Sequence, residues 1–245
     1  MPSADFSKRA CNYEASAHIQ KKYASSLVND SMAYIKSSTP KVADLGCGTG
    51  SVCGEILNSS PTAIIENYDI SEEMLRISKR KFSESGISFH CQSLPAGTEY
   101  DMIISNFALQ WYDKLPETLG LCLNKLKGGG ILSVCVPVCG SFETLRSCFE
   151  KAEAGDLFFN FPKIPHILDS ITESEVIIKE FTEEELTYNS TLDFFKNIHQ
   201  IGANQSGTNL SRTKLRKLIQ YHDELFDGKI IVKYKILKLI IKRVI

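Results

Sequence analysis

The chain has 245 residues, and its 28 Lys and Arg nearly balance its 29 Asp and Glu, for a formal net charge of −1. This length is enough for one domain with a sizeable core. So small a net charge gives no overall bias toward nucleic acid or a membrane surface. The eight cysteines form no C-x-x-C pair and no cluster at zinc spacing, so we expect reduced thiols and no metal site. Without a signal peptide or a long apolar run, the sequence predicts a cytoplasmic protein.

The first segment, residues 3–36, is polar and helix-prone. Several of its residues fall three or four apart and therefore share one helix face: Phe6, Ala10, Tyr13, Ala17 and Gln20. Two interpretations stay open. The segment is either an amphipathic helix on the domain edge or a lid over a ligand at the carboxyl ends of the strands.

A glycine-rich stretch follows, and the rest of the chain is arranged around it. The apolar residues 42–45 predict a buried strand, Gly46-Cys47-Gly48-Thr49-Gly50 a tight turn, and Ser51 the start of a helix. Strand, glycine turn and helix open a nucleotide-binding βαβ unit, because glycines let backbone N–H groups approach a ligand at a helix N-terminus. We take Cys47 as a small spacer in this turn, not as a nucleophile.

The spacing G-x-G-x-G, with Asp44 two residues before the first glycine, resembles motif I of the class I S-adenosylmethionine (SAM) methyltransferases. That resemblance implies that Asp44 faces the cationic amino end of the methionine part, where a pyrophosphate would be repelled. A second acid is expected about 20 residues further on, to bind the ribose hydroxyls. Asp69, at the end of a predicted strand over 63–69, fits that position. A nicotinamide dehydrogenase is disfavoured, because its glycines are spaced G-x-G-x-x-G.

The alternation of strands and helices continues to residue 138. It predicts a helix that begins after Ser71, a strand over 87–92, a strand over 100–105, a helix over 113–126 that ends at Gly128-Gly129-Gly130, and a central strand over 131–138.

From residue 141 to about 209 the alternation is lost, and we predict a substrate-side insertion there. Within and after it the pattern indicates a helix around Leu145, a strand over 176–181, a solvated acidic patch at 183–185, a helix over 191–201, a helix around 215–219 and a strand over 230–237.

Three further stretches make the chain similar to the BioC family, the malonyl-(acyl-carrier protein) O-methyltransferases of biotin synthesis. They are Phe6-Ser7-Lys8-Arg9-Ala10-Cys11-Asn12-Tyr13-Glu14, Ser105-Asn106-Phe107-Ala108-Leu109-Gln110-Trp111 and Phe194-Phe195-Lys196-Asn197-Ile198-His199-Gln200-Ile201-Gly202-Ala203. The resemblance implies an α/β, Rossmann-like class I methyltransferase fold: a mostly parallel seven-stranded sheet with helices on both faces. It also implies one domain over 1–245, with N-terminal lid helices (1–38) and the insertion (141–209) after the fifth strand.

The implied reaction moves the methyl group of SAM to the free carboxylate of a malonyl thioester, on the acyl-carrier protein or coenzyme A, and leaves S-adenosylhomocysteine. The methyl ester then starts pimeloyl and biotin synthesis. No metal, nucleic acid or membrane takes part. Two alternatives stay open: a methyltransferase of another small carboxylic acid, and a non-catalytic SAM-binding scaffold.

The resemblance also supplies the candidate site. Arg146 binds the substrate carboxylate through its planar fork, and the Tyr13 hydroxyl assists. The expected cofactor-binding residues are Gln20, Asp44, Gly46, Cys47, Gly48, Gly50, Asp69, Ile70, Met74, Ser93, Leu94, Ser105 and Asn106. Ile70 and Leu94 enclose the adenine, and Phe107 and Trp111 wall the substrate site, although Trp111 also suits an ordinary core. An Asp that the family carries before Ser93 is missing, so we expect Gln92 or a backbone carbonyl to accept from the adenine amine.

Carrier proteins of this kind are acidic, so we expect a basic face on the enzyme. Residues 229–243 hold six Lys and Arg and no acid. So charged a strand is typical of a sheet edge that is protected against aggregation, and we favour that interpretation. Better candidates on the ligand side are Lys8 with Arg9, and Lys214 with Arg216 and Lys217.

Overall fold

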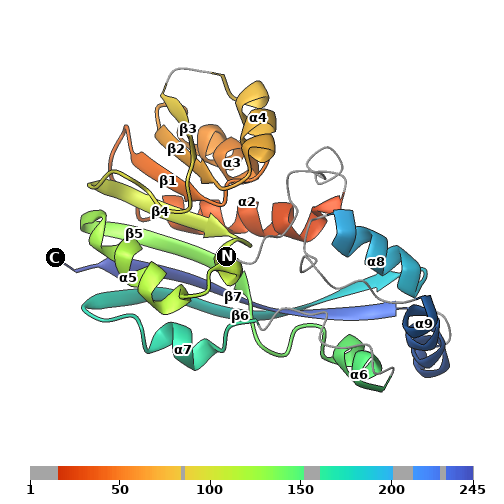
Figure 1. Cartoon of the computed structure of the whole chain (residues 1–245). Helices are drawn as coiled ribbons and strands as arrows, with labels where there is room; N and C mark the ends of the chain where they lie inside the picture. Colours follow the sequence, from red (N-terminus) through yellow and green to blue (C-terminus); the bar gives the residue numbers. More distant parts are fainter. Residues whose placement is uncertain (1–15, 84–85, 152–160, 201–211, 227–229, 245) are drawn as a thin grey trace.

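The structure, a computed structural model, describes residues 16–83, 86–151, 161–200, 212–226 and 230–244. These residues form one seven-stranded sheet with the strand order β3-β2-β1-β4-β5-β7-β6 (Figure 1). The first five strands are parallel, and β7 runs antiparallel to both of its neighbours. The predicted fold is therefore confirmed. The strands are β1 (Lys41–Leu45), β2 (Ile64–Asp69), β3 (Ile87–Cys91), β4 (Tyr100–Asn106), β5 (Leu126–Pro137), β6 (Ser174–Tyr188) and β7 (Ile230–Arg243).

Helices cover both faces of the sheet and enclose two apolar cores. On one face lie α2 (His18–Met32), α3 (Ser51–Ser59) and α4 (Glu72–Lys81), and on the other α5 (Leu115–Asn124) and α7 (Ile164–Leu168). The short helix η2 (Leu109–Trp111) follows β4. Three more helices lie beyond the carboxyl ends of the parallel strands, at the right of Figure 1: α6 (Glu143–Lys151), α8 (Thr191–Gln200) and α9 (Arg212–Phe226).

Local sequence signals explain why α4 begins and ends where it does. The Ser71 side chain accepts a hydrogen bond from the Met74 backbone N–H at 3.3 Å, as an N-cap residue should. Two glutamates occupy the first turn and three basic residues the last, which suits the helix dipole at both ends. The helix predicted after Ser71 is confirmed.

The three consecutive glycines do not end a helix, so that prediction was wrong. Helix α5 already ends at Asn124, and the glycines lie inside β5. Tyr100 pairs with Leu126 and Met102 with Ile131, so β5 carries extra residues opposite Asp101 and forms a bulge. A Cβ on Gly130 would lie 2.9 Å from the Tyr100 carbonyl oxygen, so the bulge itself requires glycine.

The lysine-rich segment is not an edge strand, so that interpretation was also wrong. β7 lies between β5 and β6, and β6 forms the edge. The predicted acidic patch belongs to β6, which is longer than predicted, and it provides partners for the lysines: Lys233 Nζ lies 2.6 Å from Glu185 and Lys235 Nζ 3.9 Å from Glu183. The alternating charges of the two strands attract each other across the ladder.

Lys238 is the buried member of this lysine series. Only 5% of it is exposed, and its Nζ lies 2.5 Å from Glu180 of β6 and also contacts Asp30 of α2. This paired charge fastens α2 to the last two strands, because a buried ammonium needs both partners to offset its lost hydration.

Two predicted segments, residues 141–209 and the N-terminal lid, are described only in part. β6 lies inside the 141–209 segment, where a strand over 176–181 was predicted, and it extends beyond that strand at both ends. Phe6, Ala10 and Tyr13 of the expected lid lie outside the described residues. The described part, α2, packs on the sheet face through residues such as Leu27 and Val28. Searching the described residues for a helix long and apolar enough to cross a membrane gives none.

Candidate functional site

A pocket of about 570 Å³ opens where the strand order reverses, between the carboxyl ends of β1 and β4. Open α/β sheets bind their ligands at this point, because the loops there diverge to opposite faces. The lining residues are Gly46, Gly48, Asp69, Ile70, Met74, Gln92, Asn106, Phe107, Ala108, Trp111 and Tyr112.

The glycine turn after β1 brings two strand ends together. Gly46 has a φ of 68°, and a Cβ on it would lie 2.2 Å from the Cβ of Ala108 in the exit of β4. Any other residue would push the two loops apart. Gly48 uses its backbone N–H differently: it donates to Asp69 Oδ2 at 2.9 Å. The turn thus shapes the pocket and fixes the acid beside it.

Asp69 is held in place by backbone donors. Besides Gly48, the Ser71 N–H donates to its other oxygen at 2.8 Å. Burial raises the pKa of this carboxyl, and the backbone hydrogen bonds from Ser71, Gly48 and Ile70 oppose that rise. An acid fixed in this way at a pocket wall can accept hydrogen bonds from a ribose diol.

Asp44 lies behind the glycine turn and is fully buried. Neither carboxylate oxygen has a hydrogen-bond partner among the described residues. Burial raises the pKa of Asp44 well above its ordinary value, and the charge of Asp69 raises it further. Asn67, its register partner on β2, is also buried with its amide atoms unpartnered in the same part of the chain. A buried carboxylate in this state favours a cationic ligand, because a positive charge offsets its desolvation.

Asp44 is not the only buried acceptor of this kind: two more belong to Asn106 at the end of β4 and to Gln20 of α2. The Asn106 side-chain Nδ2 donates to the Gln20 backbone carbonyl at 2.8 Å, which ties the first turn of α2 to the pocket. The Asn106 Oδ1 and the Gln20 Oε1 are buried and receive no hydrogen bond from a described residue. Three acceptor groups without donors suit an ammonium group and would repel a phosphate. This set of acceptors therefore fits the amino end of the methionine part of SAM.

Apolar and aromatic side chains form the remaining walls. Phe107 has a φ of 53°, a strained value for a residue other than glycine. Its ring lies 5.9 Å from that of Tyr23 on α2 and 6.3 Å from that of Tyr234 on β7. Tyr112 donates from its hydroxyl to the Ser93 carbonyl, and burial raises the pKa of that hydroxyl. Phe107 and Tyr112, with Trp111, thus form an aromatic wall of the pocket.

Comparison with known proteins identifies the kind of enzyme. A family model for the methyltransferase domain matches residues 43–134. The malonyl-(acyl-carrier protein) O-methyltransferase of Acetivibrio thermocellus is 30% identical over 244 residues, which cover 90% of this chain and 85% of that protein. The protein of that name from Bacillus cytotoxicus is 28% identical, over 94% of this chain and 86% of its own. The chain belongs to the malonyl-(acyl-carrier protein) O-methyltransferase family.

Solved structures agree with the fold of this methyltransferase. The YcgJ protein of Bacillus subtilis superposes with a TM-score of 0.61 at 13% identity, over 89% of this chain and 97% of that one. Geranyl diphosphate C-methyltransferase of Streptomyces coelicolor, solved in complex with S-adenosyl-L-homocysteine, gives 0.54 at 13% identity, over 89% and 76%. Together with the methyltransferase domain, these neighbours support the use of SAM.

The pocket of this methyltransferase brings together eight of the predicted site residues. They are Gly46, Gly48, Asp69, Ile70, Met74, Asn106, Phe107 and Trp111. Sequence reasoning did not place Ala108 or Tyr112 there and gave Gln92 only as a substitute partner for the adenine amine. Tyr112 directly follows Trp111, which was predicted to wall the substrate site. The pair of aromatic residues just after a strand was the signal that could have identified Tyr112 as a pocket residue.

The other predicted residues lie around the pocket without lining it. Cys47 is buried, and burial with the nearby charges of Asp44 and Asp69 raises its thiol pKa, so it stays a neutral spacer. Gly50 caps α3, and the buried Ser105 donates to the Leu45 carbonyl at 2.8 Å. Leu94 packs against an apolar core.

Arg146, the expected substrate-binding residue that the structure describes, does not line this pocket. Arg146 is half-buried on α6, where its backbone N–H donates to the Phe142 carbonyl at 2.9 Å. Tyr13 lies outside the described residues. The Asn197 side chain of α8 donates to the Ser16 carbonyl, just before α2, at 3.3 Å. No group of three or more His, Cys, Asp or Glu in the described ranges is arranged to hold a metal.

Proposed function

We propose that this methyltransferase transfers the methyl group of SAM to the free carboxylate of malonyl-acyl-carrier protein, which gives the methyl ester that starts pimeloyl and biotin synthesis. The observation that carries the proposal is that a relative of this name aligns over 90% of the chain. Malonyl-coenzyme A presents the same carboxylate and is the second possible acceptor.

In this proposal, different residues in and around the pocket bind different parts of the cofactor. Asp44, Asn106 and Gln20 supply the buried acceptors for the ammonium group. Asp69 accepts from the ribose hydroxyls, and Ile70 with Leu94 encloses the adenine. SAM supplies a methyl group on a positively charged sulfur. The residues of the chain need only bind SAM and the malonyl group, orient them toward each other and exclude water from them.

The acceptor needs no general base. A carboxylic acid has an ordinary pKa near 4, so the malonyl carboxylate is ionised at neutral pH. Aligning it with the methyl group can contribute about 7–11 kcal/mol of the rate enhancement. A carboxylate that leaves water must be paired, and the guanidinium of Arg146 can hold both of its oxygens. Tyr13 is the second proposed donor.

Replacement of Arg146 tests this role. Arg146→Ala should bind SAM as the unaltered enzyme does in calorimetry, while methylation of malonyl-acyl-carrier protein falls at least about 100-fold, as for loss of a charged hydrogen-bonded pair. Arg146→Lys, the matched control, keeps the charge without the fork and should fall in between. The product is measured as a mass increase of one methyl group on the carrier protein.

Three outcomes would contradict the proposal. Full activity of Arg146→Ala would remove the role given to Arg146. Methylation of free di- or tricarboxylic acids in preference to malonyl thioesters would point to another acceptor. SAM binding with no turnover of any malonyl thioester would point to a non-catalytic scaffold.

A further inference from the structure

We infer that helix α9 docks the acidic carrier protein through two exposed basic residues, Arg216 and Lys217, which we call the α9 basic face. This inference rests on the proposed function and identifies where the macromolecular part of the substrate sits. The occupant is a carrier protein whose surface is acidic.

The position of α9 suits such a partner. The pocket opens at the carboxyl ends of the parallel strands, and α6, α8 and α9 form a block beyond the same ends (Figure 1). α9 packs against α6, which carries Arg146, and against α8. A protein bound to α9 would therefore hold its acyl group on the side from which the substrate must enter.

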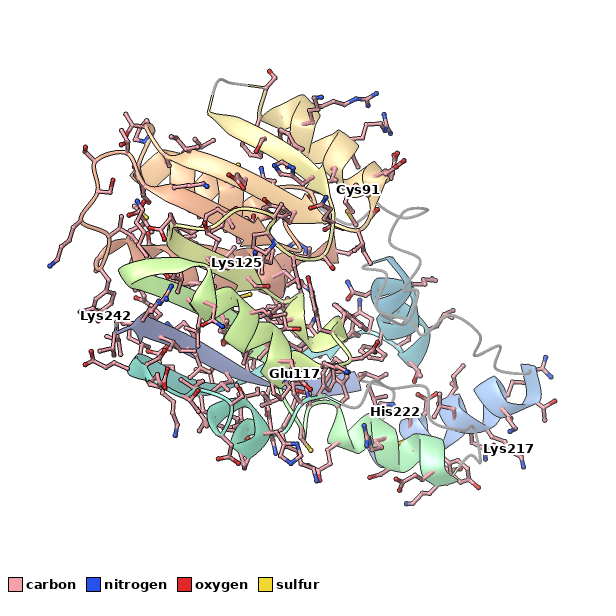
Figure 2. The ribbon with its side chains drawn as sticks, turned by 60° about the vertical axis from the view of Figure 1, so that its left-hand side comes forward. Cys91, Glu117, Lys125, Lys217, His222 and Lys242 are labelled. Carbon is pink, nitrogen blue, oxygen red and sulfur yellow. The ribbon has the colours of Figure 1, made fainter. Side chains whose placement is uncertain are left out.

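The helix is anchored on one face and exposed on the other. Leu218 and His222, one turn apart, are fully buried. Arg216 and Lys217 are exposed. In Figure 2, Lys217 lies at the outer end of the molecule, whereas His222 lies nearer to α6. The basic side chains therefore face solvent while the helix stays fixed to the core.

Among the residues that the structure describes, Arg216 and Lys217 have no acidic partner. No ion pair joins either side chain to a carboxylate of a described residue, and the acids of α9, Asp223 and Glu224, lie in its last turns. The lysines of β7 differ, because Lys233, Lys235 and Lys238 all have carboxylate partners. Lys242 lies at the opposite side of the molecule in Figure 2. Unpaired positive charge next to the substrate side attracts and orients an acidic partner.

Charge reversal at α9 separates docking from chemistry. The variant Arg216→Glu/Lys217→Glu should raise the KM for malonyl-acyl-carrier protein about tenfold or more with little change in kcat, because docking and not alignment is weakened. With malonyl-pantetheine, which has no protein to dock, both constants should change less than about twofold. The unaltered enzyme should also lose its preference for the protein-bound substrate as salt rises to about 0.5 M.

Matched variants make the result specific. Lys79→Glu/Arg80→Glu reverses two neighbouring exposed charges on α4, beside β3 at the other edge of the sheet, and should leave both substrates unaffected. Arg216→Lys/Lys217→Arg should keep the low KM for the carrier protein. Arg216→Gln/Lys217→Gln repeats the test with neutral residues if the reversal lowers the melting temperature.

The outcomes are distinguishable. Equal loss with both substrates, or no loss with the carrier protein, would overturn the docking inference and leave the proposed function intact. An unaltered enzyme that methylates neither thioester would overturn the proposed function, and this inference with it. A KM increase confined to the carrier protein supports the α9 basic face.

Discussion

At the scale of single residues, the burial of Asp44 changes how its carboxyl group binds a proton. A carboxylate without a hydrogen-bond donor in the described residues, and with Asp69 close enough to act on it, holds its proton to a higher pH than an ordinary carboxyl. An ammonium ligand favours the ionised form instead. Ligand binding and loss of this proton are therefore linked.

The linkage predicts how SAM affinity depends on pH. Because the ligand lowers the raised pKa of Asp44, binding releases a proton, and affinity should rise with pH between the bound and free pKa values, by at most about tenfold per pH unit. For the ligand-free protein the sign is opposite. A folded pKa above the unfolded value of 3.8 gives stability at low pH that is lost as pH rises through the folded pKa.

Calorimetry in two buffers of different ionisation enthalpy counts the released protons. Asp44→Asn should bind SAM more weakly and lose the pH dependence of affinity. An unchanged slope in that variant would show that another group carries the proton.

At the scale of elements, the glycine run of β5 shows how one strand adapts to its neighbour. Gly130 lies so close to the backbone of β4 that an added Cβ would meet the Tyr100 carbonyl oxygen at 2.9 Å and the Asp101 carbonyl oxygen at 3.2 Å. Gly128, two residues earlier, has nothing within 4 Å of that position. Backbone atoms cannot rotate away as a side chain can. We therefore expect a side chain to be tolerated at Gly128 and not at Gly130.

Gly130→Ala should therefore lower the free energy of unfolding by about 1–3 kcal/mol, as overpacking does. Gly128→Ala, the matched control, should change it by less than about 0.5 kcal/mol, as surface substitutions do. Urea unfolding of both variants measures the difference. Equal losses would mean that the strand shifts as a whole to accept either methyl group.

At the scale of the whole molecule, the pocket joins loops from β1, β2 and β4 that meet only in the folded state. A ligand bound there stabilises the entire fold. At 100 times its Kd, S-adenosylhomocysteine should add about 2.7 kcal/mol, and a protein of this size should then melt roughly 5–10 °C higher.

Asp69→Ala tests the specificity of that shift. The variant removes the acid that two backbone N–H groups hold at the pocket wall, so the shift should shrink to less than about 2 °C at the same ligand concentration. Thermal melts with and without ligand measure it. A full shift in the variant would place the ligand elsewhere.

The cofactor half of the molecule could be predicted from sequence because its signals are local. A buried strand, three glycines and a helix start occupy adjacent positions, and Asp69 and Asn106 each end a strand. Parallel strands then place these ends at one edge of the sheet. The strand after Gly130 was found by the same rule, although the role of the glycines was not, since a bulge depends on the neighbouring strand.

The sequence by itself thus determined the family, the fold class and the residues at the ends of β1, β2 and β4. Only the tertiary structure decided that the lysines of β7 face glutamates of β6, that Tyr112 and Ala108 reach the pocket, and that Arg216 and Lys217 are exposed on α9. The physical reason is that strand and turn signals act over a few residues, whereas pairing of charges depends on which distant segments the closed sheet makes neighbours.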